Sequence, residues 1–380
     1  MNITKKVESL VISNNKLKVV LTFAISKLLN IIYTGPLSFI KLKNFKKKFQ
    51  INKNKVLVKT LLCGVCGSDR KIISFDYSVN STAFPETKRY NQKETFLGHE
   101  LVGEVYQIGK NVKNLKKGDR VILDSVNRHD HQLNNNIFGG WTNFFVRNEN
   151  QLFKISKKLK FEQAILLEPL ACSLNAVLEA NIKKDKKNVL IVGSGIIGLG
   201  IYVFLKYFFN NLNITFLTKE EMPFTFLKKN KKINIIYNEN IVEKTSKILK
   251  TDVKKFLLTK ITSSGFDYIF ECSGDKKILN RIIKICNFNS KIILNGMIMH
   301  KSKFDLTPLW IRNIKILSTN GYKNSYKFNK IPKTFKFIQS LILKRKINTE
   351  FIKVKKFNIK SWDLALKNKE KNIVKNALMF

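Results

Sequence analysis

The alternation of apolar and polar residues differs between the first and the middle part of the chain. Residues 55–62 interleave β-branched and apolar residues with polar ones, which predicts a half-buried strand. Residues 188–192 form a continuous apolar run, which is typical of a strand buried on both faces of a parallel sheet. A helix is predicted after Gly198, and further strands are predicted at 214–217, 268–270, 292–294 and near 314–317. This alternation predicts a doubly wound α/β domain.

Length and composition favour two domains in a reducing compartment. The chain has 380 residues, of which 44% are apolar, so it can bury more than one ordinary core. Its five cysteines are too few and too scattered for a disulfide-stapled secreted fold. We therefore expect a cytoplasmic protein whose thiols can bind a metal.

The net charge of +43 has two interpretations. It could mark a partner such as nucleic acid or an anionic membrane. It could also be compositional drift, because Lys, Asn, Ile and Phe are abundant together and the lysines are scattered along the chain. We favour drift, and expect neither a nucleic acid nor a membrane as partner. The apolar run at 19–25 is too short to span a bilayer and is predicted to be a helix packed on its own domain.

A glycine motif directly follows the buried strand at 188–192. It reads Gly193-Ser-Gly195-Ile196-Ile197-Gly198 and opens an apolar helical stretch. In this context the glycines allow a tight turn, close approach of a pyrophosphate and close packing of helix on strand. The helix N-terminus offers N–H groups to the phosphates, so a dinucleotide site is predicted here.

The residues that follow the second strand bear on the choice between NAD and NADP. The position expected to hold a ribose-binding carboxylate falls on Thr218, and Lys219 is next to it. A missing carboxylate beside a lysine favours a 2′-phosphate, hence NADP. Glu220 could still reach the ribose, so NAD remains open.

A thiol, an imidazole and a carboxylate form a second candidate site. Cys66, His99 and Glu168 are suitable ligands for a catalytic zinc, which keeps three protein ligands and an open position. Taken singly, each residue is equally compatible with a structural role, so spacing alone does not select them.

Several ordered motifs resemble the medium-chain dehydrogenase/reductase superfamily, and within it the zinc alcohol dehydrogenases of the sorbitol, threonine and glucose dehydrogenase branch. The resemblance runs from about residue 50 to the end. The motifs are Cys63-Gly-Val-Cys66-Gly-Ser-Asp69, Gly98-His99-Glu100, Gly118-Asp119-Arg120-Val121, Glu168-Pro169-Leu170-Ala171, the glycine turn and Phe266-Asp267 with Cys272-Ser-Gly274.

The resemblance implies a fold, a reaction and an assembly. It implies a GroES-like β-rich catalytic domain at 1–180, a Rossmann domain at 181–321 and a return to the catalytic domain at 322–380. The reaction would be hydride transfer between a small alcohol or polyol, or its carbonyl, and NAD(P). One catalytic zinc would lower the pKa of the alcohol. A homo-oligomer, dimer or tetramer, is also implied.

The resemblance also assigns roles to individual residues. Cys66 and His99 would be zinc ligands. Glu168 stands where the family places the third ligand, and Glu100 could replace or join it. Ser68 would take the substrate proton and Asp69 would orient a ligand. Cys63 is the family's non-ligand cysteine, and Cys172 is a weaker substitute ligand.

Two features depart from the family pattern. No cysteine lies between Cys66 and Cys172, so the structural-zinc lobe of many relatives cannot form, and His129 with His131 is a weak substitute. Lys71 stands near a relay histidine of some relatives. The alternatives are a zinc-free quinone or enoyl reductase of the same superfamily, and a decayed protein that binds a dinucleotide or nucleic acid without turnover.

Overall fold

The computed structural model describes residues 1–76, 94–124, 139–183, 187–219, 233–257, 259–301, 303–322 and 331–380. The chain forms two compact units. Unit 1 contains Met1–Glu168, Phe335–Leu343 and Lys353–Phe380; unit 2 contains Pro169–Thr334 and Lys344–Ile352. The domain limits at 180 and 321 that the sequence suggested stay a prediction. Within the described residues, no helix has both the length and the apolar content needed to cross a bilayer.

Unit 1 is built on a seven-stranded sheet in the order β17-β18-β3-β5-β6-β8, with β7 added to β3. The strands are β3 (Lys55–Gly64), β5 (Leu101–Ile108), β6 (Arg120–Leu123), β7 (Phe144–Asn148), β8 (Leu152–Lys154), β17 (Val354–Asn358) and β18 (Lys375–Met379). The strand predicted at 55–62 is therefore confirmed. β18 pairs with β3 through Ala377 and Gly64, so the end of the chain returns to the first unit.

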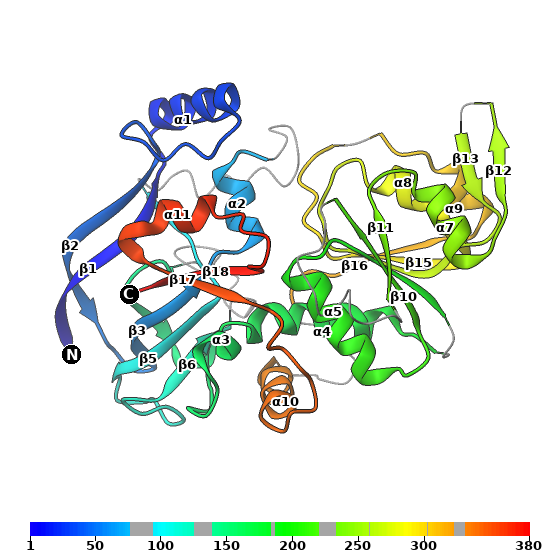
Figure 1. The fold of residues 1–380 in the computed structure, drawn as a ribbon. Helices are drawn as coiled ribbons and strands as arrows, with labels where there is room; N and C mark the ends of the chain where they lie inside the picture. The colour runs from blue at the N-terminus through cyan, green and yellow to red at the C-terminus, as the bar shows by residue number, and fades with distance from the viewer. Residues whose placement is uncertain are drawn as a thin grey trace. The chain divides into compact units, whose positions relative to one another are not determined.

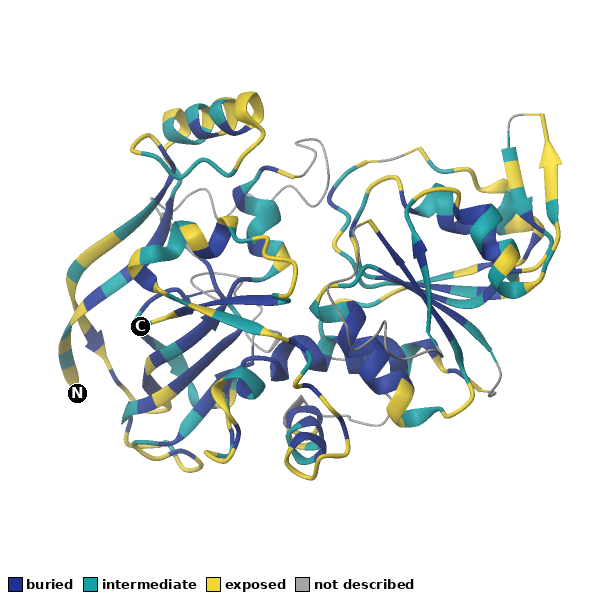
Figure 2. Ribbon diagram, viewed as in Figure 1, coloured by how far each residue is buried: buried dark blue, intermediate teal, exposed yellow. Residues whose placement is uncertain are grey.

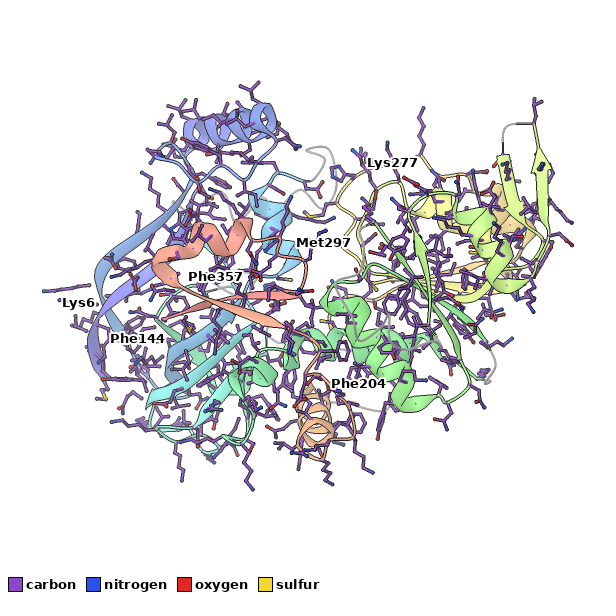
Figure 3. The ribbon with its side chains drawn as sticks, in the orientation of Figure 1. Lys6, Phe144, Phe204, Lys277, Met297 and Phe357 are labelled. Atoms are coloured by element: carbon purple, nitrogen blue, oxygen red, sulfur yellow. The ribbon has the colours of Figure 1, made fainter. Side chains whose placement is uncertain are left out.

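A second sheet in unit 1 was not predicted. It has the order β2-β1-β4, from Asn2–Ser13 (β1), Ile40–Gln50 (β2) and Glu94–Phe96 (β4). The helix expected near 19–25 is α1 (Lys16–Leu29), which connects β1 to β2 (Figure 1). Lysines on both strands obscure the apolar alternation of this hairpin in the sequence. In Figure 3 the side chain of Lys6 extends outward from β1.

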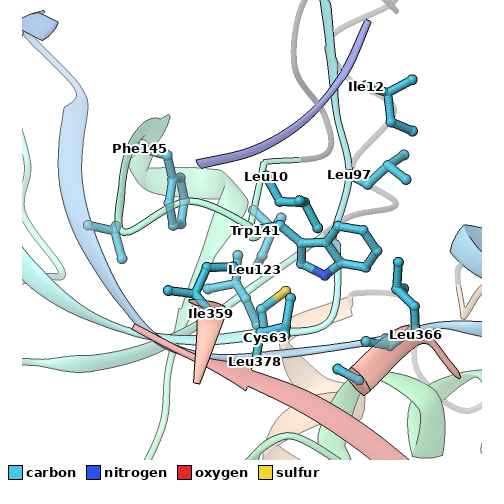
Figure 4. Packing of buried hydrophobic residues seen from close by; sticks show 14 of the residues in the cluster. Leu10, Ile12, Cys63, Leu97, Leu123, Trp141, Phe145, Ile359, Leu366 and Leu378 are labelled. Carbon is cyan, nitrogen blue, oxygen red and sulfur yellow. The ribbon is translucent and has the colours of Figure 1, made fainter. Parts of the chain in front are cut away.

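The core of unit 1 surrounds Trp141, which is 1% exposed (Figure 4). Leu10 of β1, Cys63 of β3 and Leu378 of β18 belong to the same apolar cluster. The Trp141 indole N–H donates to the carbonyl of Gly64 at 3.2 Å. Burial of this large ring therefore also fixes the backbone at the end of β3.

Unit 2 contains a six-stranded parallel sheet in the order β11-β10-β9-β14-β15-β16. The strands are β9 (Asn188–Val192), β10 (Asn213–Thr218), β11 (Asn234–Tyr237), β14 (Phe266–Glu271), β15 (Cys286–Leu294) and β16 (Lys315–Ser318). Helix α5 (Ile196–Phe208) covers one face, and α7 (Ile241–Leu249) and α8 (Leu279–Ile282) cover the other. This is the strand order of a dinucleotide-binding domain, and it confirms the predicted doubly wound class.

Candidate functional site

The candidate metal site begins where β3 ends. Cys66 is the N-cap residue of the short helix α2 (Gly67–Ile73), and the side chain of Asp69 accepts the Cys66 backbone N–H at 3.0 Å. This cap satisfies a backbone donor and fixes the position of the Cys66 side chain. Ser68, in the first turn of α2, is half-buried.

His99 and Glu100 come from the loop between β4 and β5. The Gly64 N–H donates to the Glu100 carbonyl at 2.6 Å, which ties this loop to the end of β3. The His99 Nδ1 lies 3.8 Å from Asp69 Oδ1. Ligand atoms of Cys66, His99 and Glu100 all lie within 4.8 Å of one another.

The electrostatics of this group favour a cation. Burial alone would lower the pKa of the His99 imidazole. The sulfur of Cys66 and the carboxylates of Asp69 and Glu168 outweigh burial and hold that pKa well above its usual value. Burial raises the pKa of Asp69, although His99 acts in the opposite direction. Several anionic groups thus surround one imidazole, as they would around a metal ion.

Glu168 lies in the first turn of α4 (Leu167–Ala180) and is 8% exposed. Its charge acts on both His99 and Lys375. It is not a member of the group of three, in which Glu100 supplies the carboxylate. The structure therefore brings together all four residues suggested by the sequence, with Glu100 nearest to the thiol and the imidazole.

Sequence reasoning missed Lys375, which forms a buried ion pair with Glu100. Burial would lower the pKa of Lys375, but the Glu100 carboxylate and the Cys66 sulfur raise it. A side chain at Gly64 would collide with this pair, since its Cβ would lie 2.2 Å from Glu100 Oε2. Nothing in the sequence distinguishes Lys375 from the many other lysines, because only the pairing of β18 with β3 brings it here.

The other two cysteines of the motifs have different environments. Cys63 is fully buried in the unit 1 core, and burial raises the pKa of its thiol well above the usual value. A thiol held protonated is unsuited to bind a metal. Cys172 is half-buried on α4, outside the group of three.

The residues present fit a zinc ion. Zinc binds thiolate, imidazole and carboxylate at about 2.0–2.3 Å, so ligand atoms of one site lie roughly 3–4 Å apart. The Cys66, His99 and Glu100 donors lie within 4.8 Å of one another, which is close to this spacing. Their chemical types are those of a catalytic zinc site.

Unit 2 carries the predicted glycine turn. Gly193 has a φ of +99°, which side-chain-bearing residues rarely adopt, and Gly195 is the N-cap of α5. A Cβ on Gly198 would lie 2.1 Å from the Gly193 carbonyl oxygen, whereas a Cβ on Gly195 would meet nothing within 4 Å. Gly198 is thus required for packing, and Gly195 leaves open space before the helix N-terminus.

Two further cofactor candidates lie at the end of β10. The Thr218 hydroxyl is 3.2 Å from the Ser194 hydroxyl, so β10 meets the glycine turn here. The Lys219 ammonium lies 2.6 Å from a carboxylate oxygen of Asp275. Glu220, His129 and His131 lie outside the described residues.

A six-stranded Rossmann-type sheet in one chain with a β-rich unit that carries a cysteine–histidine–glutamate group defines the medium-chain dehydrogenase/reductase fold. A model of the alcohol dehydrogenase GroES-like domain matches residues 52–157, and a model of zinc-binding dehydrogenases matches residues 240–340. The chain belongs to the medium-chain zinc alcohol dehydrogenase family.

Individual relatives have low sequence identity to this chain, but they match most of its length. L-idonate 5-dehydrogenase of Vitis vinifera is 27% identical over 290 residues, which cover 71% of this chain and 74% of that protein. (R,R)-butanediol dehydrogenase of Bacillus subtilis is 26% identical over 289 residues, covering 72% and 79%. A putative zinc-binding dehydrogenase from Sinorhizobium meliloti, solved with NADP, has a TM-score of 0.67 at 17% identity, covering 99% and 100%.

Proposed function

We propose that this protein is a zinc-dependent dehydrogenase that transfers a hydride between a small alcohol or polyol, or its carbonyl, and NAD(P). The observation that carries the proposal is the group of Cys66, His99 and Glu100, of which Glu100 is buried and the other two are half-buried, in a chain that also holds a glycine turn suited to a dinucleotide. The relatives named above act on a sugar acid and on a diol, which favours a substrate with neighbouring oxygen groups.

Cys66, His99 and Glu100 would hold the zinc ion, and Glu168, whose charge acts on His99, is the candidate for a further ligand. When bound, zinc would supply a Lewis acid that lowers the pKa of an alcohol hydroxyl. Cys66 as thiolate and one carboxylate balance a divalent charge. Lys375 forms a buried ion pair with Glu100.

The remaining residues move a proton and orient the ligands. Ser68 lies two residues after Cys66 in the first turn of α2, and its hydroxyl would relay the alcohol proton, donating its own proton to water or to the cofactor ribose. Asp69 lies beside the His99 imidazole and would fix its orientation, as carboxylates do for metal-bound histidines.

NADP is the cofactor that we favour. The end of β10 presents Thr218 and Lys219 and no carboxylate at the position expected to bind the ribose 2′-hydroxyl. Lys219 is mostly exposed and could turn from Asp275 to a 2′-phosphate. Asp275 lies within reach of the same ammonium, so it would oppose a strong preference for NADP.

A dimer formed through the edge strand β16 is the assembly that we favour. The strand ends the six-stranded sheet, and Trp310 and Ile311 of α9 (Thr307–Ile311), just before it, are exposed. An uncovered edge with adjacent large apolar side chains is typical of an interface between copies. Sedimentation velocity should show a dimer that Trp310→Glu converts to a monomer; an unchanged dimer would place the interface elsewhere.

The proposed function is tested by nicotinamide absorbance with a panel of diols, polyols, sugar acids and simple alcohols, using NAD and NADP. We expect turnover of at least one vicinal diol or polyol, abolished by a chelator and restored by zinc. Turnover that survives complete zinc removal would instead indicate the zinc-free reductase, and cofactor binding without turnover would indicate a decayed binder.

A further inference from the structure

Helix α1 buries only two side chains against unit 1, and both are polar. Its buried side chains are Thr22 and Ser26. The Phe39 N–H donates to Thr22 Oγ1 at 2.9 Å, and the Tyr33 N–H donates to Ser26 Oγ at 3.3 Å. Val19 packs against the unit 1 core and the Phe23 ring contacts Phe75 at 5.3 Å between ring centroids, but neither of these apolar side chains is buried, whereas a helix that packs on its own domain normally buries an apolar face. The expectation that the apolar run at 19–25 serves internal packing is therefore met only in part.

The opposite side of α1 carries an exposed apolar stripe, which consists of Leu17, Val20, Ala24 and Leu28. Spacings of three and four residues place these side chains along one face of a helix. Leu17 is 67% exposed, Val20 is 60% exposed and Leu28 is 85% exposed. Figure 2 shows the helix largely in the colours of exposed and intermediate residues.

Lysines border the stripe. Lys16 is one turn before Val20, Lys27 is one turn after Ala24, and both lysines are exposed. From Ser9 to Ser68 the sequence contains no Asp or Glu. Lys16 and Lys27 thus make the border of the apolar stripe positively charged, and the chain on either side of α1 supplies no carboxylate.

Strand β2 adds to this charge. It contains five lysines, which are Lys41, Lys43, Lys46, Lys47 and Lys48. Lys41 lowers the pKa of Lys18 on α1, both through a side-chain hydrogen bond and through its positive charge. The positive charge of Lys43 lowers this pKa further. Positive groups from the helix and from the strand therefore crowd one another, and an anionic partner would relieve this repulsion.

The combination of exposed leucines and lysines selects one class of partner. A second copy would bring the same lysines against each other, which opposes self-association. A nucleic acid supplies phosphates but no apolar layer for Leu17 and Leu28. A bilayer with anionic headgroups supplies both, and interfacial helices bind it with an apolar face and lysines beside that face.

We propose that α1 docks on the surface of an anionic phospholipid bilayer, with the apolar stripe among the upper acyl chains and Lys16 and Lys27 at the headgroups. The helix lies on the membrane and does not span it, and for this helix the proposal replaces the expectation from composition that a membrane is not a partner. None of its residues belongs to the group of Cys66, His99 and Glu100 or to the glycine turn, so the proposal stands independently of the catalytic activity.

The test is flotation of the full chain with vesicles of phosphatidylcholine containing phosphatidylserine, and with vesicles of phosphatidylcholine alone. Wild type should bind the anionic vesicles, and Leu17→Gln/Val20→Gln/Leu28→Gln should bind them about tenfold more weakly or worse. Lys16→Gln/Lys27→Gln should lose roughly fivefold for each lysine. Because all five side chains are exposed, the melting temperature and the enzyme activity should not change.

A matched control lies on unit 2. The hairpin of β12 (Val253–Phe256) and β13 (Thr259–Thr262) carries Phe256, 57% exposed, and Leu257, 98% exposed, next to lysines. Phe256→Gln/Leu257→Gln should bind the vesicles as wild type does. The proposal is overturned if wild type does not bind the anionic vesicles, if it binds neutral ones equally well, or if the stripe variant and the control behave alike.

Discussion

The metal group of unit 1 and the glycine turn of unit 2 are both predicted to bind charged ligands, but they are built by opposite means. The metal group of Cys66, His99 and Glu100 uses side chains from two segments joined by the pairing of β3 with β5, and the pairing of β18 with β3 adds Lys375 beside Glu100. The glycine turn uses the backbone of six consecutive residues and depends on missing side chains. The metal group should be disrupted when a charged side chain is removed, and the glycine turn should be disrupted when a side chain is added.

The largest effect is expected from Lys375→Met. In zinc-free protein, removal of this lysine leaves the Glu100 carboxylate buried without its partner, which costs about 3–5 kcal/mol. Urea unfolding followed by tryptophan fluorescence measures this loss. The double variant Lys375→Met/Glu100→Gln is the control and should recover most of the stability; a double variant as unstable as the single one would show that the pair is not the cause.

Gly198→Ala tests the packing requirement of the glycine turn. The added Cβ would lie 2.1 Å from a backbone oxygen, so the turn must distort at a cost of about 2–3 kcal/mol. A lowered melting temperature of unit 2, in the absence of any cofactor, is the expected result. An unchanged melting temperature would mean that helix α5 can shift without penalty.

Gly195→Ala is the matched variant at the same turn. Its Cβ meets no protein atom within 4 Å, so the protein alone should melt as wild type does. The same methyl would stand where a pyrophosphate approaches, and we expect an approximately tenfold rise in the dissociation constant for NADP. Calorimetric titration provides this constant, and equal affinity in the two proteins would place the phosphates elsewhere.

Lys219→Ala should have the smallest effect. If Lys219 turns from Asp275 to a 2′-phosphate, its loss should raise the KM for NADP roughly fivefold, about 1 kcal/mol, and leave the KM for NAD unchanged. Asp275→Asn is the complementary variant and should improve the use of NADP. An equal effect of Lys219→Ala on both cofactors would remove the argument for NADP.

The same contrast explains how much the sequence could predict. The glycine turn and the strands at 188–192 and 214–217 are local patterns, and the structure confirms all of these elements. The choice between Glu100 and Glu168 depends on distances between segments that lie far apart in the chain, so the sequence left it open. Lys375 was missed because its burial follows from the β18–β3 pairing, and the β1–β2 hairpin was missed because lysines interrupt its pattern.

We propose that Cys66, His99 and a neighbouring carboxylate bind one catalytic zinc. The decisive measurement is elemental analysis of freshly purified protein, beside a Cys66→Ser variant shown to be folded. We expect about one zinc per chain in the wild type and loss of that zinc in the variant. No zinc in folded wild-type protein kept from chelators, or full retention of zinc by Cys66→Ser, would contradict it.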